Sequence, residues 1–161
     1  MGAISKGVTR KVEFDVTVDT AIFAAGDAMH SSVITLSNVV QGSVPSARIE
    51  SVTVVDQANQ KSALDILFFS ANPSNTTVTV NGALDVDDGD LDNYFLGHIS
   101  VAATDYASLA DNAYGTKQGI SLPVFSSRQG VRDIYCIVVC RGTPTFAAAT
   151  DLRIKLGIKQ D

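Results

Sequence analysis

Five aspartates crowd into eight residues near the middle of this sequence, and they are its clearest candidate for chemistry. They are Asp85, Asp87, Asp88, Asp90 and Asp92. Hard cations such as Ca²⁺ bind carboxylate oxygens in loops of this kind, so the segment is a candidate metal site. Its spacing is not that of an EF-hand loop, which needs Gly at the sixth position and an acidic residue at the twelfth. Counting from Asp85, Gly89 is fifth and Leu96 is twelfth.

The same segment has a second interpretation, in which the carboxylates stabilise the local backbone. Asp87 or Asp88 would cap a short helix running to Tyr94, because an Asp side chain accepts hydrogen bonds from the first N–H groups of a helix. Negative charge is also favoured near a helix N-terminus. We expect the capped helix, with no metal ion and no other cofactor bound.

The two histidines and two cysteines form no obvious catalytic group. Neither His30 nor His98 belongs to a recognisable catalytic motif, and the serines that follow His30 do not by adjacency create a nucleophile and base pair. Cys136 and Cys140 lie in a β-branched stretch that predicts a strand. Residues four apart in a strand are about 13 Å apart, whereas a disulfide needs Cα atoms within about 7 Å. We therefore expect two reduced cysteines that fill the core.

Motifs of known mechanism are also missing from the sequence. It has no Gly-rich phosphate loop between a strand and a helix, and no His-Glu-x-x-His or Cys-x-x-Cys pair. The sequence therefore predicts a protein that is not an enzyme.

Apolar and polar residues alternate near both ends of the sequence. The apolar positions are Val12, Phe14, Val16 and Val18 near the start, and Leu152, Ile154, Leu156 and Ile158 near the end. A period of two is typical of a strand with one buried face. Two such strands at the ends predict a single closed β unit.

Turn residues divide the rest of the sequence into short strands. These are expected at residues 32–39, 48–56, 63–70, 76–81, 94–103, 119–126 and 133–141. Residues 48–56 have apolar side chains at both odd and even positions, which predicts a strand covered on both faces. Residues 57–61 predict a hairpin-like turn. Residues 104–117 have no clear pattern. This rhythm predicts an all-β, single-domain antiparallel β-sandwich that is jelly-roll-like, with about eight to ten strands and at most one short helix.

We expect residues 8–161 to form the sandwich and residues 1–7 to form a flexible N-terminal arm. The arm consists of Met1, Gly2, Ala3, Ile4, Ser5, Lys6 and Gly7. A short end of this kind typically frays. The alternative is that the arm orders against a neighbouring subunit, which makes its residues interface candidates.

Charge and hydropathy exclude two classes of partner. The net charge of −5 argues against nucleic acid, because phosphate binding needs a basic surface. No apolar run approaches the length of a membrane span, and the first residues lack the apolar core of a secretory signal. We expect a protein made in the cytoplasm that binds neither nucleic acid nor membrane.

Several segments resemble small virion proteins of tailed bacteriophages, which are commonly encoded close to the major capsid protein. They are Ser62-Ala-Leu-Asp-Ile-Leu-Phe-Phe-Ser-Ala-Asn-Pro73, Ala83-Leu-Asp85, Asp90-Leu-Asp92 and Arg141-Gly-Thr-Pro-Thr-Phe-Ala-Ala-Ala-Thr-Asp-Leu-Arg153. The resemblance spans residues 46–161 as a pattern of strands and turns. It implies a head decoration, or cement, protein: a β-sandwich that binds the outer capsid surface, usually at symmetry axes, and stabilises it.

The resemblance implies two partners, the major capsid protein and further copies of this chain, with a trimer favoured. An acidic protein is better placed outside the capsid than inside it, because packaged DNA is a dense polyanion. One alternative is a tail or neck component of the virion, which copy number would distinguish. Another, of a different class, is a carbohydrate-binding β-sandwich module, although the sequence has no Trp and only four Tyr to form a binding platform.

Overall fold

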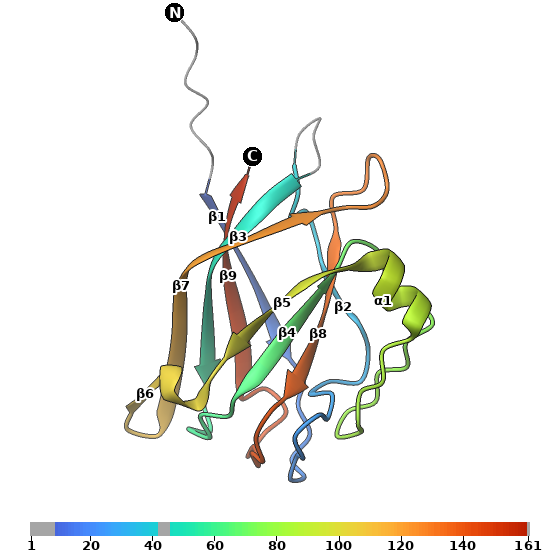
Figure 1. The fold of residues 1–161 in the computed structure, drawn as a ribbon. Helices are drawn as coiled ribbons and strands as arrows, with labels where there is room; N and C mark the ends of the chain where they lie inside the picture. Colours follow the sequence, from blue (N-terminus) through green and yellow to red (C-terminus); the bar gives the residue numbers. More distant parts are fainter. Residues whose placement is uncertain (1–8, 42–45, 161) are drawn as a thin grey trace, which may run out of the picture.

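The computed structural model describes residues 9–41 and 46–160, which form two antiparallel β-sheets packed face to face (Figure 1). This arrangement confirms the predicted all-β sandwich. In chain order the elements are β1 (Thr9–Val16), β2 (Ile34–Leu36), β3 (Ser46–Asp56), β4 (Leu64–Phe69), α1 (Asp88–Tyr94), β5 (Phe95–Val101), the 3₁₀ helix η1 (Ala103–Asp105), β6 (Tyr106–Leu109), β7 (Asn112–Phe125), β8 (Ile134–Cys140) and β9 (Leu152–Gln160).

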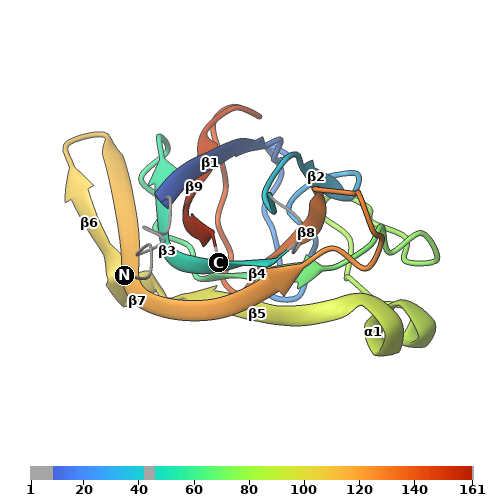
Figure 2. The ribbon, with the colours of Figure 1, turned by 90° about the horizontal axis from the view of Figure 1, so that it is seen from above.

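The strands pair as a nested ladder, which is the connectivity of a jelly roll. β1 pairs with β9, β2 with β8, β3 with β7 and β4 with β5. The rolled-up ladder gives a five-stranded sheet of order β1-β9-β3-β7-β6 and a four-stranded sheet of order β2-β8-β4-β5. β6 lies outside the ladder and pairs with β7 at the edge of the larger sheet (Figure 2).

The alternating segments at the two ends of the sequence lie side by side as β1 and β9. Phe14 is opposite Ile154, and Val16 is opposite Leu152. The apolar positions of both strands therefore point to the same face, where Val16, Leu152 and Ile154 are buried between the sheets. This direct pairing confirms that the two strands close one β unit.

A β-bulge in β3 explains why its sequence is apolar at both parities. The register with β9 shifts between Ile49 and Ser51, so that Glu50 is an extra residue relative to β9. The register with β7 shifts at the same place. An extra residue reverses which positions face the core. Ile49 faces the core before the bulge, and Val52 and Val54 face it afterwards. The prediction of cover on both faces is wrong, because the apolar positions of both parities lie on one face, before and after the bulge.

Two other local predictions differ from the structure, and a segment without a clear pattern takes a defined form. Residues 57–61 join β3 in one sheet to β4 in the other, so they form a crossover instead of a hairpin turn. Residues 76–81 form no strand and contribute one isolated bridge, between Val80 and Ala28. Residues 104–117 form η1, β6 and the first part of β7, and the chain reverses at Ala110, whose φ is 51°.

The long connection between β4 and β5 covers the outer face of the four-stranded sheet. Phe69, Ile137 and Val139 are buried on that face, under apolar side chains from the connection and from α1. The covering residues include Val78, Leu84, Val86 and Tyr94. Because β8 is covered on both sides, the sequence around its cysteines shows no alternation.

Buried aspartates hold several loops in place by accepting hydrogen bonds from backbone N–H groups nearby. Asp27 accepts from the N–H of Ala24 (2.7 Å). Asp56 accepts from the N–H groups of Ala58 (3.0 Å) and Lys61 (2.7 Å). Asp151 accepts from the N–H groups of Ala147 (2.9 Å) and Ala148 (2.7 Å). The short side chain of Asp can accept hydrogen bonds from backbone N–H groups of the turn in which it lies, and the longer side chain of Glu is less suited to this. This role accounts for part of the bias toward Asp among the 17 acidic residues, of which only two are Glu.

Candidate functional sites

The aspartate-rich segment forms a capped helix, as its second interpretation predicts. Asp87 is the N-cap of α1, and its side chain accepts hydrogen bonds from the N–H groups of Gly89 (2.9 Å) and Asp90 (3.2 Å). The helix ends at Tyr94. The carboxylate of Asp87 thus binds the backbone at the start of α1.

Asp90 is the one carboxylate of this segment that is fully buried. Its Oδ2 accepts hydrogen bonds from the N–H of Asn75 (2.9 Å), the N–H of Thr76 (2.8 Å) and the hydroxyl of Thr76 (2.9 Å). The hydroxyl of Thr76 in turn accepts one from the N–H of Asp87 (3.1 Å). Asp90 therefore ties α1 to the turn at residues 72–76.

The remaining aspartates of the segment, Asp85, Asp88 and Asp92, are exposed. In the described ranges 9–41 and 46–160, no three His, Cys, Asp or Glu side chains lie together in a way that could hold a metal ion. Of the five carboxylates, Asp87 caps the helix and Asp90 anchors the neighbouring turn.

His30 is buried and its ring joins two parts of the backbone. Nδ1 lies 2.6 Å from the carbonyl oxygen of Ser32, and Nε2 accepts a hydrogen bond from the N–H of Val138 at 2.8 Å. Burial lowers the pKa of His30, and the hydrogen bond to Ser32 partly opposes this. The ring is therefore a neutral structural bridge, whereas His98 is exposed on β5.

Cys136 and Cys140 are both free and buried, as expected from their spacing. They face the core between the two sheets. Burial raises the pKa of Cys136, which keeps its thiol protonated. Neither residue is placed as a nucleophile.

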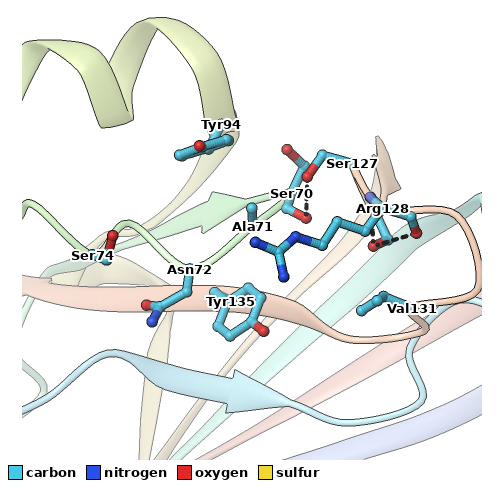
Figure 3. A pocket seen from close by; sticks show the side chains of 10 residues that line it. Ser70, Ala71, Asn72, Ser74, Tyr94, Ser127, Arg128, Val131 and Tyr135 are labelled. Atoms are coloured by element: carbon cyan, nitrogen blue, oxygen red, sulfur yellow. Dashed lines mark hydrogen bonds between the residues drawn. The ribbon is translucent and has the colours of Figure 1, made fainter.

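A polar pocket lies where the end of β4, the end of α1 and the loop between β7 and β8 meet (Figure 3). Its volume is about 640 Å³. The described residues that line it are Ser70, Ala71, Asn72, Ser74, Tyr94, Ser126, Ser127, Arg128, Val131 and Tyr135. Figure 3 shows the Arg128 side chain extending into the pocket toward Asn72 and Tyr135.

Backbone hydrogen bonds around Ser70 fix the walls of this pocket. The N–H of Ser70 donates to the carbonyl of Tyr94 (2.8 Å), and the carbonyl of Ser70 accepts from the N–H of Ser127 (3.0 Å). The N–H of Val131 donates to the carbonyl of Arg128 (3.1 Å), and Gly130 has a φ of 81°. This is the pattern of a type II turn, which needs a positive φ at its third residue.

The sequence did not single out this pocket, because its residues come from three separate segments. Residues 127–130 fall between the strands expected at 119–126 and 133–141, where no function was assigned. The one signal was an arginine in this loop, five residues before its one carboxylate, Asp133. Among the described residues, no acidic side chain forms an ion pair with Arg128.

A second surface lies at the other end of the sandwich, where two uncharged loops meet. They are residues 20–26 and 142–150, seen at the lower end of Figure 1, away from the C-terminus. The N–H of Phe23 donates to the carbonyl of Pro144 (3.0 Å), and the rings of Phe23 and Phe146 pack edge to face with centroids 6.0 Å apart. Both rings are buried and hold the loops together.

Among the exposed side chains of these two loops, four are threonines (Thr20, Thr143, Thr145 and Thr150) and seven are apolar. The apolar ones are Ala21, Ile22, Ala24, Ala25, Ala147, Ala148 and Ala149. Ile22 is the most exposed of the large apolar residues described, at 65%. We call these seven residues the apolar end. Sequence reasoning missed it, although the absence of charge from both loops was a visible signal.

The predicted interface residues Met1 to Gly7 lie outside the described residues. Among the residues that are described, no helix is long and apolar enough to cross a membrane. A scan against protein-family models and a search of curated proteins find no match to this chain.

Proposed function

We propose that this protein binds the outer surface of a bacteriophage capsid and stabilises it as a decoration protein. The observation that carries the proposal is the apolar end. Charged residues are depleted from the buried centre of protein interfaces, and the two loops of the apolar end contain none. A surface of this kind suits a protein that acts through contact area.

The apolar end is also held rigidly, which favours binding. Asp27 and Asp151 fix the two loops from within, and the Phe23 and Phe146 rings join them. A preformed surface loses little conformational entropy when it docks. On a symmetric shell, many such contacts add to a high avidity even when each one is weak.

The proposal includes two further expectations about assembly. The protein occupies the exterior of the shell, because its net charge of −5 would be repelled by packaged DNA. It also forms a homotrimer, which light scattering of the purified protein or a reconstruction of decorated capsids would detect.

The test is to incubate the purified protein with expanded capsids that lack it. We expect the wild-type protein to bind in a copy number close to that of the capsid subunit and to raise the temperature at which the capsids break. Ile22→Asp should weaken binding by about tenfold or more, because it removes an apolar side chain worth about 1.5–3 kcal/mol when buried.

Phe125→Asp is the matched control, since Phe125 is 49% exposed at the far end of β7 and lies outside the apolar end. It should bind like the wild-type protein. Absence of any binding by the wild-type protein would refute the decoration role. Equal loss in both variants, or in neither, would show that the apolar end is not the contact surface.

A further inference from the structure

The polar pocket carries an isolated positive charge. Arg128 points into it, and none of the described lining residues is acidic, although the sequence has 17 acidic residues and a net charge of −5. A guanidinium presents its N–H groups as a planar fork that matches a carboxylate. The charge of the pocket therefore selects an anionic group.

The pocket also contains polar groups with unused hydrogen-bonding capacity. Among the described residues, no hydrogen bond involves the Asn72 side-chain amide or the Ser74 hydroxyl. The Ser127 hydroxyl donates to the carbonyl of Ser70 (3.3 Å) and keeps its acceptor positions. Amide and hydroxyl groups of this kind pair with the hydroxyls of a ligand.

Two aromatic side chains complete the lining. Tyr94 and Tyr135 are half-buried on different elements, α1 and β8, and both border the pocket (Figure 3). A tyrosine offers an apolar ring face and a hydroxyl at its edge, which suits a ligand that is itself part apolar and part polar. Two of the four tyrosines in the sequence are thus gathered at one site.

The size of the pocket excludes a small inorganic anion as the best fit. Its volume of about 640 Å³ lies within the usual range for organic ligands, roughly 300–1,000 Å³. A phosphate or sulfate would use Arg128 and leave the tyrosines and hydroxyls without a role. A sugar ring that carries a carboxylate would use all three kinds of group.

We propose that this pocket binds an acidic saccharide, with the sugar carboxylate on Arg128, its hydroxyls on Asn72, Ser74 and Ser127, and its ring against the tyrosines. β8 runs from Tyr135 in the pocket toward the loop of residues 142–150 at the apolar end. The two surfaces thus lie at opposite ends of a strand about 20 Å long. A protein docked through its apolar end would keep the pocket open to solvent. The inference does not depend on capsid binding and can be tested on the purified protein.

The experiment uses ligand-observed NMR and calorimetry with glucuronic acid and N-acetylneuraminic acid as probes, and with glucose and acetate as matched partial ligands. We expect the acidic sugars to bind more tightly than either glucose or acetate. Arg128→Gln should weaken the binding of the acidic sugars by about tenfold or more, because it removes a charge-assisted pair. Arg132→Gln, the same change at an exposed arginine in the same loop but outside the lining, should have no effect.

Each other result overturns the inference in a defined way. Binding of no probe at millimolar concentration removes the saccharide site. Acetate binding as tightly as the acidic sugars indicates a simple carboxylate site, and glucose binding that does not change in Arg128→Gln indicates a neutral sugar site. Equal weakening in Arg128→Gln and Arg132→Gln would show that only the overall charge matters. Circular dichroism of both variants identifies any loss of folding.

Discussion

Replacing Asp90 by alanine should strongly destabilise the fold, even though no catalytic or metal-binding role is at stake. The side chain is 0% exposed, and its Oδ2 accepts three hydrogen bonds from the turn at residues 72–76. The N–H of Thr76 also reaches the carbonyl of Pro73 at 3.2 Å and keeps a partner. The N–H of Asn75 and the hydroxyl of Thr76 are left without an acceptor.

The size of the effect follows from these two orphaned donors. The hydroxyl of the buried Thr76 would be a buried donor without a partner, which costs about 1–3 kcal/mol. Asn75 is exposed, so water can replace the acceptor of its N–H and only the net value of that hydrogen bond, about 0.5–1.5 kcal/mol, is lost. Together these give about 3 kcal/mol for Asp90→Ala. In a domain of this size each kcal/mol lowers the melting temperature by about 2–4 °C, which gives a fall of about 6–12 °C.

The assay is thermal and urea unfolding of three variants alongside the wild-type protein. Asp90→Asn keeps an acceptor oxygen but loses its charge, so it should lose only about 1 kcal/mol. Asp92→Ala is the control, because Asp92 is exposed in the same helix and gains the same helix propensity from alanine. If Asp90→Ala were no less stable than Asp92→Ala, the network around Oδ2 would contribute nothing and the reasoning would fail.

Three further results are expected. Because burial lowers the pKa of His30, the unfolded chain binds a proton at a higher pH than the folded protein does. The free energy of unfolding should therefore be full above about pH 6.5 and decline below it by at most about 1.4 kcal/mol per pH unit. His30→Gln should remove this slope between about pH 7 and about pH 5. Cys136 and Cys140 should not react with a thiol reagent in the native protein and should both react in denaturant, and rapid native labelling would contradict their burial. A Cβ at Gly157 would collide with the hydroxyl of Ser51, which can rotate away. Gly157→Ala should therefore cost no more than about 1 kcal/mol in urea unfolding, and adding Ser51→Ala should remove this cost.

The sequence predicts the fold class well where local pattern and tertiary role agree. The alternation around Phe14 and Ile154 is visible because each strand has one buried and one open face. Prediction from the sequence fails at β3, because a bulge at Glu50 changes which positions, odd or even, face the core, and no local residue pattern marks that change. It also fails at residues 76–81, whose alternation comes from Val78 and Val80 packing against the sandwich without joining a strand.

The candidate sites were predictable in part. The capping role of Asp87 follows from sequence, because a helix cap is decided within a few residues. The burial of Asp90 does not, since its partners Asn75 and Thr76 belong to a separate turn. The pocket around Arg128 brings together three segments that only the tertiary fold places side by side.

The nested ladder has a consequence for how this chain folds during its synthesis. β9 comes after all the other described strands in the sequence, yet it lies between β1 and β3 in the finished sheet. The five-stranded sheet cannot close until β9 has emerged, so β1 must wait for a partner about 140 residues away. Until then the apolar positions of β1 stay open to other chains, so a chain that stops before β9 is prone to aggregate.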